Sequence, residues 1–411
     1  MIIKKLLPMS MLALATSMAF ADTKLNALFM SQAAYSEADI KAMTAEFEEN
    51  NPSISVALEF VPYEALHDKI ITSAAAGTNG YDIVLYDVVW PAEFAEGGFL
   101  TDVTDRVPKE LGNQIFDGAW TTVTYNSRIF GMPWILDTKY LFFNREMLSQ
   151  AGIETPPSTW AEVMEQSQIL KDKGVVKYPL VWSWSQSEAM ICDYTTLVAA
   201  HGGSFFEEGK PAFDKDGALA AIDYMATSLK DGLTNPASTE YFEEDVRRVF
   251  SNGEAAFALN WTYMNALVND PSESKVAGKI GVIPAPGVKG VSEASAVNGS
   301  MGLGIPSNSA HKDEAWALIS YLTDKKVQEN YAKLSLPVWK ESYSIKSVTE
   351  GQEELVSAAS KAIAVMSPRP VVPAYTEVSN ILQKHLHSIL LGEESSEDAL
   401  ADAVKRVSRI R

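Results

Sequence analysis

"YDIVLYDVVW", residues 81–90, joins an apolar run directly to a charged residue and a large ring. Residues 83–85 form that run, which is typical of a strand buried on both faces. Asp87 and Trp90 follow at once, where they contribute little to solubility or to packing. The stretch therefore predicts a buried strand with a functional position at its end.

Element types alternate along the N-terminal part of the chain. Residues 25–30 and 54–60 are predicted strands, the second because apolar residues alternate along it. Ser36 and Asp39 have the spacing of a capping box and predict that a helix begins there. A second helix is predicted over about residues 63–76. With the strand quoted above, the order is βαβαβ, which predicts a parallel sheet covered by helices.

A second α/β unit is predicted from residue 133 onward. Short apolar strands flank Asp137 in "RIFGMPWILDTKYLFFN", and further strands are predicted at residues 178–184 and 255–260. The stretch "GVIPAPGVKG" is interpreted as a turn region that carries the chain out of this unit. A strand at residues 302–305 is then expected to rejoin the first unit. The length of 411 residues is sufficient for two such domains.

The first 21 residues have the pattern of a secretory signal peptide. Lys4 and Lys5 form a basic start, residues 6–18 an apolar run, and "AFA" at 19–21 a cleavage site before Asp22. A transmembrane anchor is the weaker alternative, because the run is short and polar residues interrupt it. No cysteine stands at the cleavage point, so no lipid anchor is expected. The pattern predicts a soluble protein exported to the periplasm.

Charge and cysteine content narrow the range of partners. The formal net charge of −19 becomes −21 when the two leader lysines are removed. So acidic a protein is not expected to bind nucleic acid or an anionic membrane. Cys192 is the single cysteine, cannot form an internal disulfide, and is predicted to be a buried, inert thiol.

Candidate binding residues come from the ends of the predicted strands, because ligands of open α/β sheets bind outside the carboxyl ends of the strands. These positions repeatedly combine an aromatic ring with an oxygen- or amide-bearing side chain. The residues found in this way are Gln32, Tyr35, Asp87, Trp90, Asp137, Trp182, Trp184, Asn260 and Trp261. Asn298 and Gly299, in "NGSMGLGIP", are added because the glycines there permit a close backbone approach to a ligand.

This combination of side chains suits a carbohydrate. The C–H faces of a sugar ring are apolar and lie flat on tryptophan or tyrosine rings. Asp, Asn and Gln exchange hydrogen bonds with neighbouring hydroxyls. Each residue also has a purely structural interpretation, since a single tryptophan is more often core. Asp87, Asp137 and Asn260 are also suited to capping a turn or a helix. The prediction depends on the joint pattern.

Catalytic interpretations find little support. The chain has no HExxH, no complete GxSxG and no P-loop. His385 and His387 are two residues apart and point to different sides of a helix, so no metal site is predicted. Asp87 and Asp137 remain conceivable as the carboxylate pair of an exported glycoside hydrolase. Acidic doublets such as Glu243-Glu244 are interpreted as solvated faces.

Taken together, the chain resembles a family, the extracellular solute-binding proteins (family 1) of bacterial ABC sugar importers, in its maltose- and trehalose-binding group. The resemblance covers essentially the whole mature chain through the order and spacing of several segments. They are "AEFEENNPSISV", "KIITSAAAGTNGYDIVLYDVVWPAEFAEGGFLTDVT", "RIFGMPWILDTKYLFFNREMLSQAGIETPPSTWAEV", "FSNGEAAFALNW", "GLGIPSNSAHKDEAWALISYLTD" and "SPRPVVPAYTEVSNILQKHL".

The resemblance implies a type II periplasmic binding protein fold, α/β in class, with two lobes, a ligand between them and strands that cross several times. The crossings are expected near residues 131–133, 282–286 and 336–339. The implied division is a signal peptide at 1–21, lobe 1 at 22–132 and 285–336, and lobe 2 at 133–284 and 337–411.

The resemblance also adds Arg369 and Tyr375 to the ligand contacts, and most of the other contacts it implies are those already named. Relatives often have a glycine pair and a tryptophan where this chain has Asn298-Gly299-Ser300-Met301, so the identity of the sugar cannot be transferred. The implied protein is a monomer that closes on a di- or oligosaccharide or glycoside and delivers it to permease subunits in the inner membrane. It needs no cofactor and catalyses nothing. A cationic ligand such as a polyamine is the alternative, and the location of Arg369 discriminates between the two.

Overall fold

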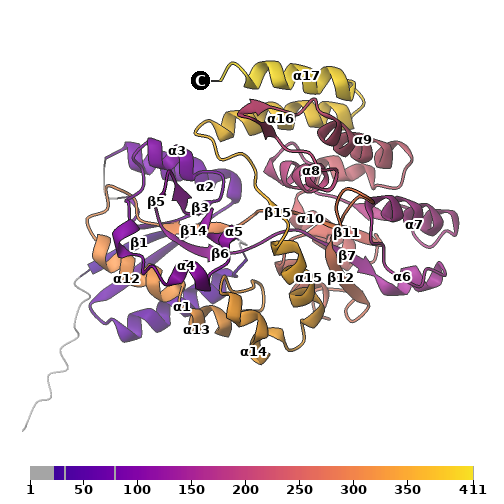
Figure 1. The fold of residues 1–411 in the computed structure, drawn as a ribbon. Coiled ribbons are helices and arrows are strands. Elements are labelled where there is room, and N and C mark those ends of the chain that lie inside the picture. The colour runs from indigo at the N-terminus through magenta and orange to yellow at the C-terminus, as the bar shows by residue number, and fades with distance from the viewer. Residues whose placement is uncertain (1–22, 32–33, 78–79, 411) are drawn as a thin grey trace, which may run out of the picture.

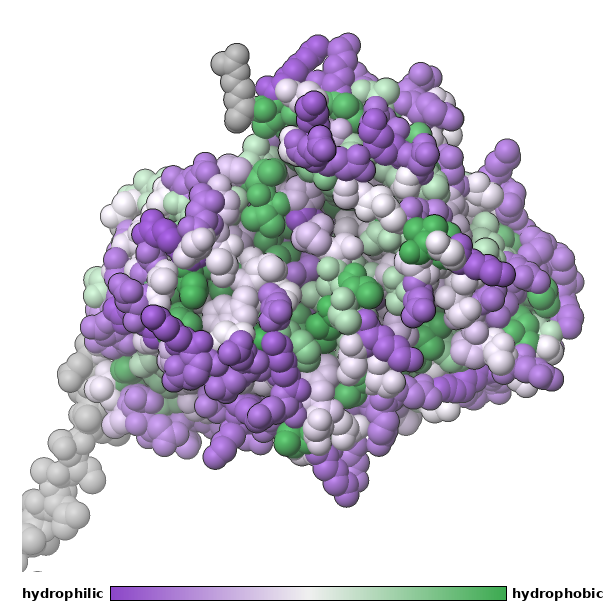
Figure 2. Space-filling view, viewed as in Figure 1, coloured by the Kyte–Doolittle hydropathy of each residue, from purple (hydrophilic) through white to green (hydrophobic). Residues whose placement is uncertain are grey.

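Two β-sheets, each flanked by helices, divide the chain into two lobes that lie side by side (Figure 1). The structure is a computed structural model and describes residues 23–31, 34–77 and 80–410. The predicted signal peptide and Gln32 lie outside the described residues. Hydrophilic residues cover much of the surface seen in Figure 2, which agrees with the acidic composition.

Lobe 1 is built on a five-stranded sheet. β1 pairs in parallel with β2 and β3, as the βαβαβ pattern predicted, whereas β14 pairs antiparallel with β3 and β6. In order across the sheet, the strands are β2 (Ile54–Val61), β1 (Thr23–Met30), β3 (Ile83–Asp87), β14 (Met301–Gly304) and β6 (Met132–Ile135). The longer helices of lobe 1 are α1 (Glu37–Asn50), α2 (Tyr63–Ala75) and α12 (Lys312–Leu322).

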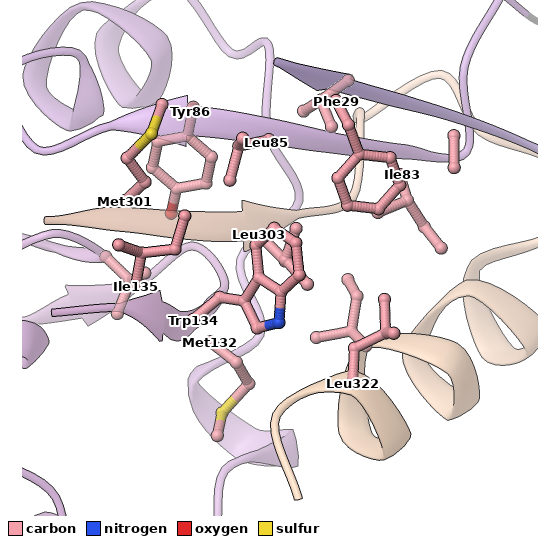
Figure 3. Close-up of a cluster of buried hydrophobic side chains, with 14 of the residues drawn as sticks. Phe29, Ile83, Leu85, Tyr86, Met132, Trp134, Ile135, Met301, Leu303 and Leu322 are labelled. Carbon is pink, nitrogen blue, oxygen red and sulfur yellow. The ribbon is translucent and has the colours of Figure 1, made fainter. Parts of the chain in front are cut away.

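The capping box and the buried strand that the sequence of lobe 1 predicts are both present in the structure. Ser36 and Asp39 form the capping box that starts α1, with the Asp39 amide 3.0 Å from Ser36 Oγ. All residues of β3 are buried, because helices cover both faces of the sheet. Figure 3 shows the core on one of these faces, where Phe29 and Leu322 pack around the fully buried ring of Trp134.

Lobe 2 is built on a six-stranded mixed sheet. In order, its strands are β15 (Met366–Ser367), β13 (Ala294–Val297), β12 (Ile280–Pro286), β7 (Tyr140–Asn144), β11 (Phe257–Asn260) and β8 (Leu180–Val181). One face carries α7 (Trp160–Asp172), α8 (Glu188–Ala200), α9 (Asp216–Lys230), α16 (Tyr375–Leu390) and α17 (Ser396–Val407). The other face carries α10 (Glu243–Ser251), α11 (Tyr263–Val268) and α15 (Glu353–Ile363).

Short elements complete the fold. They are α3 (Pro91–Glu96), α4 (Leu111–Gln114), α5 (Asp117–Trp120), α6 (Arg145–Gln150), α13 (Lys325–Asn330), α14 (Lys346–Thr349), β4 (Thr124–Tyr125), β5 (Arg128–Ile129), β9 (Phe206–Glu207), β10 (Lys210–Pro211), η1 (Thr104–Arg106), η2 (Pro236–Glu240) and η3 (Lys340–Ser344). Within the described part of the chain, no helix has the length and apolarity needed to cross a bilayer.

The crossings between lobes differ in part from those expected. Sheet membership places the first at residues 136–139, between β6 and β7, and the second at residues 298–300, between β13 and β14. The first therefore lies a few residues after the expected position near 131–133, and the second follows β13 instead of lying near 282–286, which belongs to β12. "GVIPAPG" looks like a turn because of its prolines, yet it contains β12. This strand tolerates them because it pairs with β7 at one end and with β13 at the other. The third crossing follows α13.

Candidate ligand-binding site

A cavity of about 360 Å³ lies between the lobes and is referred to below as the interlobe cavity. Its walls come from both lobes and from the crossings themselves. Lobe 1 contributes Tyr63, Glu64 and Asp87, and the first two crossings with their strands contribute Asp137, Gly299 and Met301. Lobe 2 contributes Glu188, Cys192, Phe242, Glu243, Glu244, Trp261 and Tyr263. The segment after β15 contributes Arg369. The ends of β3, β6, β11 and β13 meet here, as the strand-end argument requires.

Asp137 occupies the first crossing and is 7% exposed. Its Oδ1 atom accepts hydrogen bonds from the Thr138 amide (2.9 Å), the Thr262 amide (3.3 Å) and Thr262 Oγ1 (2.6 Å). All of these bonds end on Oδ1, Oδ2 accepts none from the described residues, and the residue lines the cavity. Burial raises the pKa of Asp137 to about 7, although these hydrogen bonds oppose the shift. One carboxylate oxygen of a largely buried residue is thus left for a ligand.

This environment predicts that Asp137→Asn stabilises the unliganded protein as pH rises. A raised carboxyl pKa means that ionising Asp137 costs more in the folded than in the unfolded state, so the penalty grows from about pH 4 and levels off above about pH 7. Asparagine keeps an acceptor for the Thr138 and Thr262 donors and carries no charge. We expect a gain of about 2–4 kcal/mol at pH 8 and a smaller one at pH 5.

Urea denaturation at pH 5 and pH 8 measures this gain. The other titratable groups near Asp137 are Lys139, Tyr140 and Tyr343, and of these only Lys139 carries a charge across this range. The exposed Asp214 is a matched control, because its conversion to asparagine removes a solvated charge. An equal gain at both pH values would contradict the prediction.

Arg369 connects the two lobes through two carboxylates. Its Nη2 donates to Asp87 Oδ1 at the end of β3 (2.8 Å), and its Nη1 donates to Glu188 Oε1 at the start of α8 (2.7 Å). Tyr375 and Ser379 of α16 also donate to Glu188. Burial opposes the charge of Arg369, but the Asp87 and Glu188 carboxylates hold its pKa above the ordinary value. The arginine is 2% exposed, so this is a buried ionic contact across the lobe interface.

Lys139, two residues after Asp137, forms a second buried network. Its Nζ lies 2.6 Å from Asp193 Oδ1 and 3.3 Å from Glu243 Oε1, and it donates to Ser183 Oγ (2.9 Å). Burial opposes the charge, yet the two carboxylates hold the pKa of Lys139 above its ordinary value. The same Nζ lies 5.0 Å from the ring centroid of Trp261, within the range of a cation–π contact.

The Trp261 ring lines the cavity, and two hydrogen bonds hold this residue in place. Its Nε1 donates to Glu243 Oε1 (3.1 Å), and its backbone amide donates to Asn260 Oδ1 (2.8 Å). Gly299 allows the ring to lie close to the second crossing, since a Cβ atom there would come within 2.3 Å of Trp261 Cζ3. The close approach predicted for this glycine is therefore made by a side chain of the protein.

Gly299→Ala is accordingly expected to weaken ligand binding by about 10- to 100-fold, because the new methyl group displaces the Trp261 ring. Calorimetric titration of the ligand measures the loss. Gly112→Ala is a matched control, since a Cβ atom there meets nothing within 4 Å. The prediction fails if the two variants bind with the same affinity as the unaltered protein.

The structure brings together some of the predicted residues and separates others. Asp87, Asp137, Trp261, Gly299 and Arg369 line the interlobe cavity. Three more lie directly behind it: Asn260 donates to the Glu243 carbonyl (2.8 Å), Asn298 accepts from Arg369 through its carbonyl (3.3 Å), and Tyr375 donates to Glu188. Asp87 also accepts from the Val89 amide, so its interpretation as a turn cap holds as well (3.1 Å).

Four predicted aromatic contacts lie in the cores instead. Trp182 and Trp184 stack on each other with centroids 5.0 Å apart, and both are fully buried in lobe 2. Tyr35 packs against Trp134, and Trp90 lies under Tyr63, whose ring takes the place at the cavity expected for Trp90. These corrections share a physical reason: helices cover the strand ends concerned, so the rings are drawn into the cores.

Several residues of the site were not predicted. Tyr63, Glu188, Glu243, Glu244 and Tyr263 line the cavity, and Lys139 supports it from behind. For two of them, Glu188 and Lys139, the sequence carries a signal. Glu188 and Asp193 are the only charges of the otherwise uncharged segment that forms α8, and Lys139 stands between two apolar strands. Charges in buried elements require partners. The prediction that Cys192 is buried is confirmed, and burial raises the pKa of its thiol.

The fold and the interlobe cavity define a two-lobed solute-binding protein. The chain belongs to the bacterial extracellular solute-binding proteins, whose family model matches residues 33–329. This confirms the resemblance and the predicted fold class. It is a solute-binding protein of the kind used by ABC transporters.

Solved structures and curated relatives agree with this assignment. MalE3 of T. maritima, solved with maltose bound, is 32% identical, with a TM-score of 0.87 and coverage of 94% of this chain and 99% of that one. An ABC transporter solute-binding protein of Thermotoga lettingae, bound with α-D-tagatose, is 26% identical, with a TM-score of 0.84 and coverage of 94% and 99%. The mannitol-binding protein of Pseudomonas aeruginosa is 23% identical over 402 residues, or 90% of this chain and 89% of the relative.

Proposed function

We propose that the chain is the periplasmic substrate-binding protein of an ABC importer that captures a carbohydrate or polyol between its lobes. The observation that carries this proposal is the interlobe cavity, in which the rings of Tyr63 and Trp261 come together with unfilled carboxylate oxygens. Its volume lies in the range of about 300–1,000 Å³ typical of small-molecule sites. The similar proteins that bind maltose, tagatose and mannitol support this ligand class.

Hinge closure is the proposed mechanism. The ligand first meets the groups on the crossings and on one lobe, and the other lobe then completes the contacts. Arg369 joins the lobes through Asp87 of lobe 1, and we propose that this contact stabilises the closed form. The closed protein then presents surfaces of both lobes to permease subunits in the inner membrane. We propose that it acts as a monomer, exported by its signal peptide and without a lipid anchor.

A hydrolytic function has less support. Asp87 is occupied by Arg369 and by Tyr63, whose hydroxyl lies 3.3 Å from Asp87 Oδ2. It therefore does not stand free as a nucleophile or a general acid. We propose that the protein catalyses nothing, and that it needs neither a cofactor nor a metal. Among the described residues, no group of His, Cys, Asp and Glu is arranged to hold a metal ion.

Calorimetry against a panel of sugars and polyols tests the proposal, with maltose, trehalose, glucose, tagatose, mannitol and the polyamines putrescine and spermidine as probes. We expect heat of binding with at least one carbohydrate or polyol, and its loss in Trp261→Ala. Trp316→Ala, on α12 and away from the cavity, serves as the control. If no carbohydrate or polyol gives heat of binding and a polyamine does, the proposal is overturned in favour of the cationic alternative.

A further inference from the structure

The interlobe cavity carries an excess of negative charge. Its lining contains six carboxylates and a single guanidinium, that of Arg369. The excess persists when the cations behind the lining are included. Arg369 forms ion pairs with both Asp87 and Glu188. Lys139 forms ion pairs with both Asp193 and Glu243. In each group one positive charge faces two carboxylates, so one negative charge remains uncompensated. Among the carboxylates of the cavity lining, only Glu244 has a cation, Arg247, bonded to both of its oxygens.

Asp137 is a second and independent observation. It is more than nine-tenths buried, lines the cavity and has one oxygen without a partner in the described part of the chain. No ion pair joins it to any described cation within 4.0 Å. In its ionised form, which a nearby positive charge favours, the Asp137 carboxylate accepts hydrogen bonds and cannot donate them. A buried, half-satisfied carboxylate of this kind requires a donor, and most strongly a charged one.

Asp137 and Glu243 both line the cavity, and each accepts a hydrogen bond from the segment that follows β11. Asp137 accepts from the Thr262 amide, and Glu243 accepts from the neighbouring Trp261 indole. The rings of Trp261 and Tyr263 also line the cavity. Lys139 Nζ already lies 3.3 Å from Glu243 Oε1 and 5.0 Å from the Trp261 ring centroid, so the acceptor left for a ligand cation is Asp137.

We propose that the natural ligand is a sugar or polyol that carries a positively charged amine, and that the ammonium group binds at the Asp137 carboxylate. This inference rests on the proposed function and names the substrate class more closely. An ammonium group supplies three donors and one positive charge, which match the unfilled acceptors. Arg369 lines the cavity but does not repel such a ligand, because its charge is more than balanced by Asp87 and Glu188.

Matched pairs of probes test the inference by calorimetry at pH 7 and constant ionic strength. The pairs are D-glucose with D-glucosamine, and D-sorbitol with D-glucamine, in which an amine replaces one hydroxyl. N-acetyl-D-glucosamine removes the charge while keeping the nitrogen. We expect the amine of at least one pair to bind at least tenfold more tightly than its hydroxyl counterpart, and acetylation to abolish the gain.

A pair of variants assigns the gain to Asp137. Asp137→Asn should lower the affinity for the amine at least tenfold more than it lowers the affinity for the hydroxyl counterpart, so that the advantage of the amine is lost, whereas Asp214→Asn on the surface of lobe 2 should change neither affinity. Thermal melts establish that both variants are folded, and the acetylated probe tests the charge without any variant.

The outcomes separate the two proposals. If neutral sugars or polyols bind and their amines bind no better, the inference is wrong and the proposed function stands. An amine advantage that survives in Asp137→Asn overturns the assignment to Asp137. If no carbohydrate or polyol binds, with or without an amine, both proposals fail together.

Discussion

Arg369→Met is expected to destabilise the closed protein by about 3–5 kcal/mol, because it leaves Asp87 and Glu188 buried near each other without a cation. Opening of the lobes relieves part of this cost by hydrating both carboxylates. The variant should therefore have a lower melting temperature and a larger radius of gyration in the presence of ligand. Denaturation and small-angle scattering measure the two effects.

Arg128→Met is the matched control for this change. Arg128 also pairs with an aspartate, Asp102, but its side chain is 60% exposed. Exposed pairs contribute about 0–1 kcal/mol, so little loss is expected. If Arg369→Met and Arg128→Met lose similar stability, and both close on ligand normally, Arg369 does not join the lobes energetically.

Lys139→Met should destabilise lobe 2 by a similar amount, about 3–5 kcal/mol, whether the lobes are open or closed. Lys139 and Asp193 are both fully buried, and the substitution leaves the Asp193 carboxylate without its cation. Because Asp193 then favours its neutral form, the loss should shrink as pH is lowered. Urea denaturation of the unliganded protein at pH 5 and pH 8 measures the change.

A double variant distinguishes loss of the cation from loss of packing. Adding Asp193→Leu to Lys139→Met removes both charges, and replacing a buried ion pair by apolar residues is often neutral. Recovery of most of the lost stability is therefore expected. If the double variant is no more stable than Lys139→Met alone, packing of the lysine stem rather than its charge sustains lobe 2.

The fold was predictable because its signals are local. Apolar residues at residues 83–85 and the capping box at Ser36 each act within a few positions, and the order of elements then determines a parallel sheet. The strand-end rule also found Asp87, Asp137 and Trp261, because it depends on sheet geometry rather than on particular partners. The crossings were missed where prolines inside β12 imitated a turn.

The rest of the site could not be predicted because its partners are distant in the sequence. Arg369 and Glu188 are 181 positions apart, and Lys139 and Asp193 are 54 apart. A single sequence gives no sign of such pairing. Trp182 and Trp184 follow a strand as Trp261 does, but β8 is the edge strand of its sheet, and its end is covered by the lobe-2 core. Only the assembled sheet distinguishes these cases.

A hydrogen bond joins the first two crossings at the cavity: the Gly299 amide donates to the Asp137 carbonyl (3.0 Å). A ligand bound at Asp137, as proposed, would contact the crossings about which the lobes are proposed to rotate, where the relative displacement of the lobes is smallest. Substitutions that alter ligand selectivity at Asp137 should therefore leave the closure of the lobes on ligand unchanged. A fluorescent biosensor made from this protein should accordingly carry its dyes far from the crossings, on the outer helices of each lobe. There a small rotation of the lobes changes the distance between the dyes most.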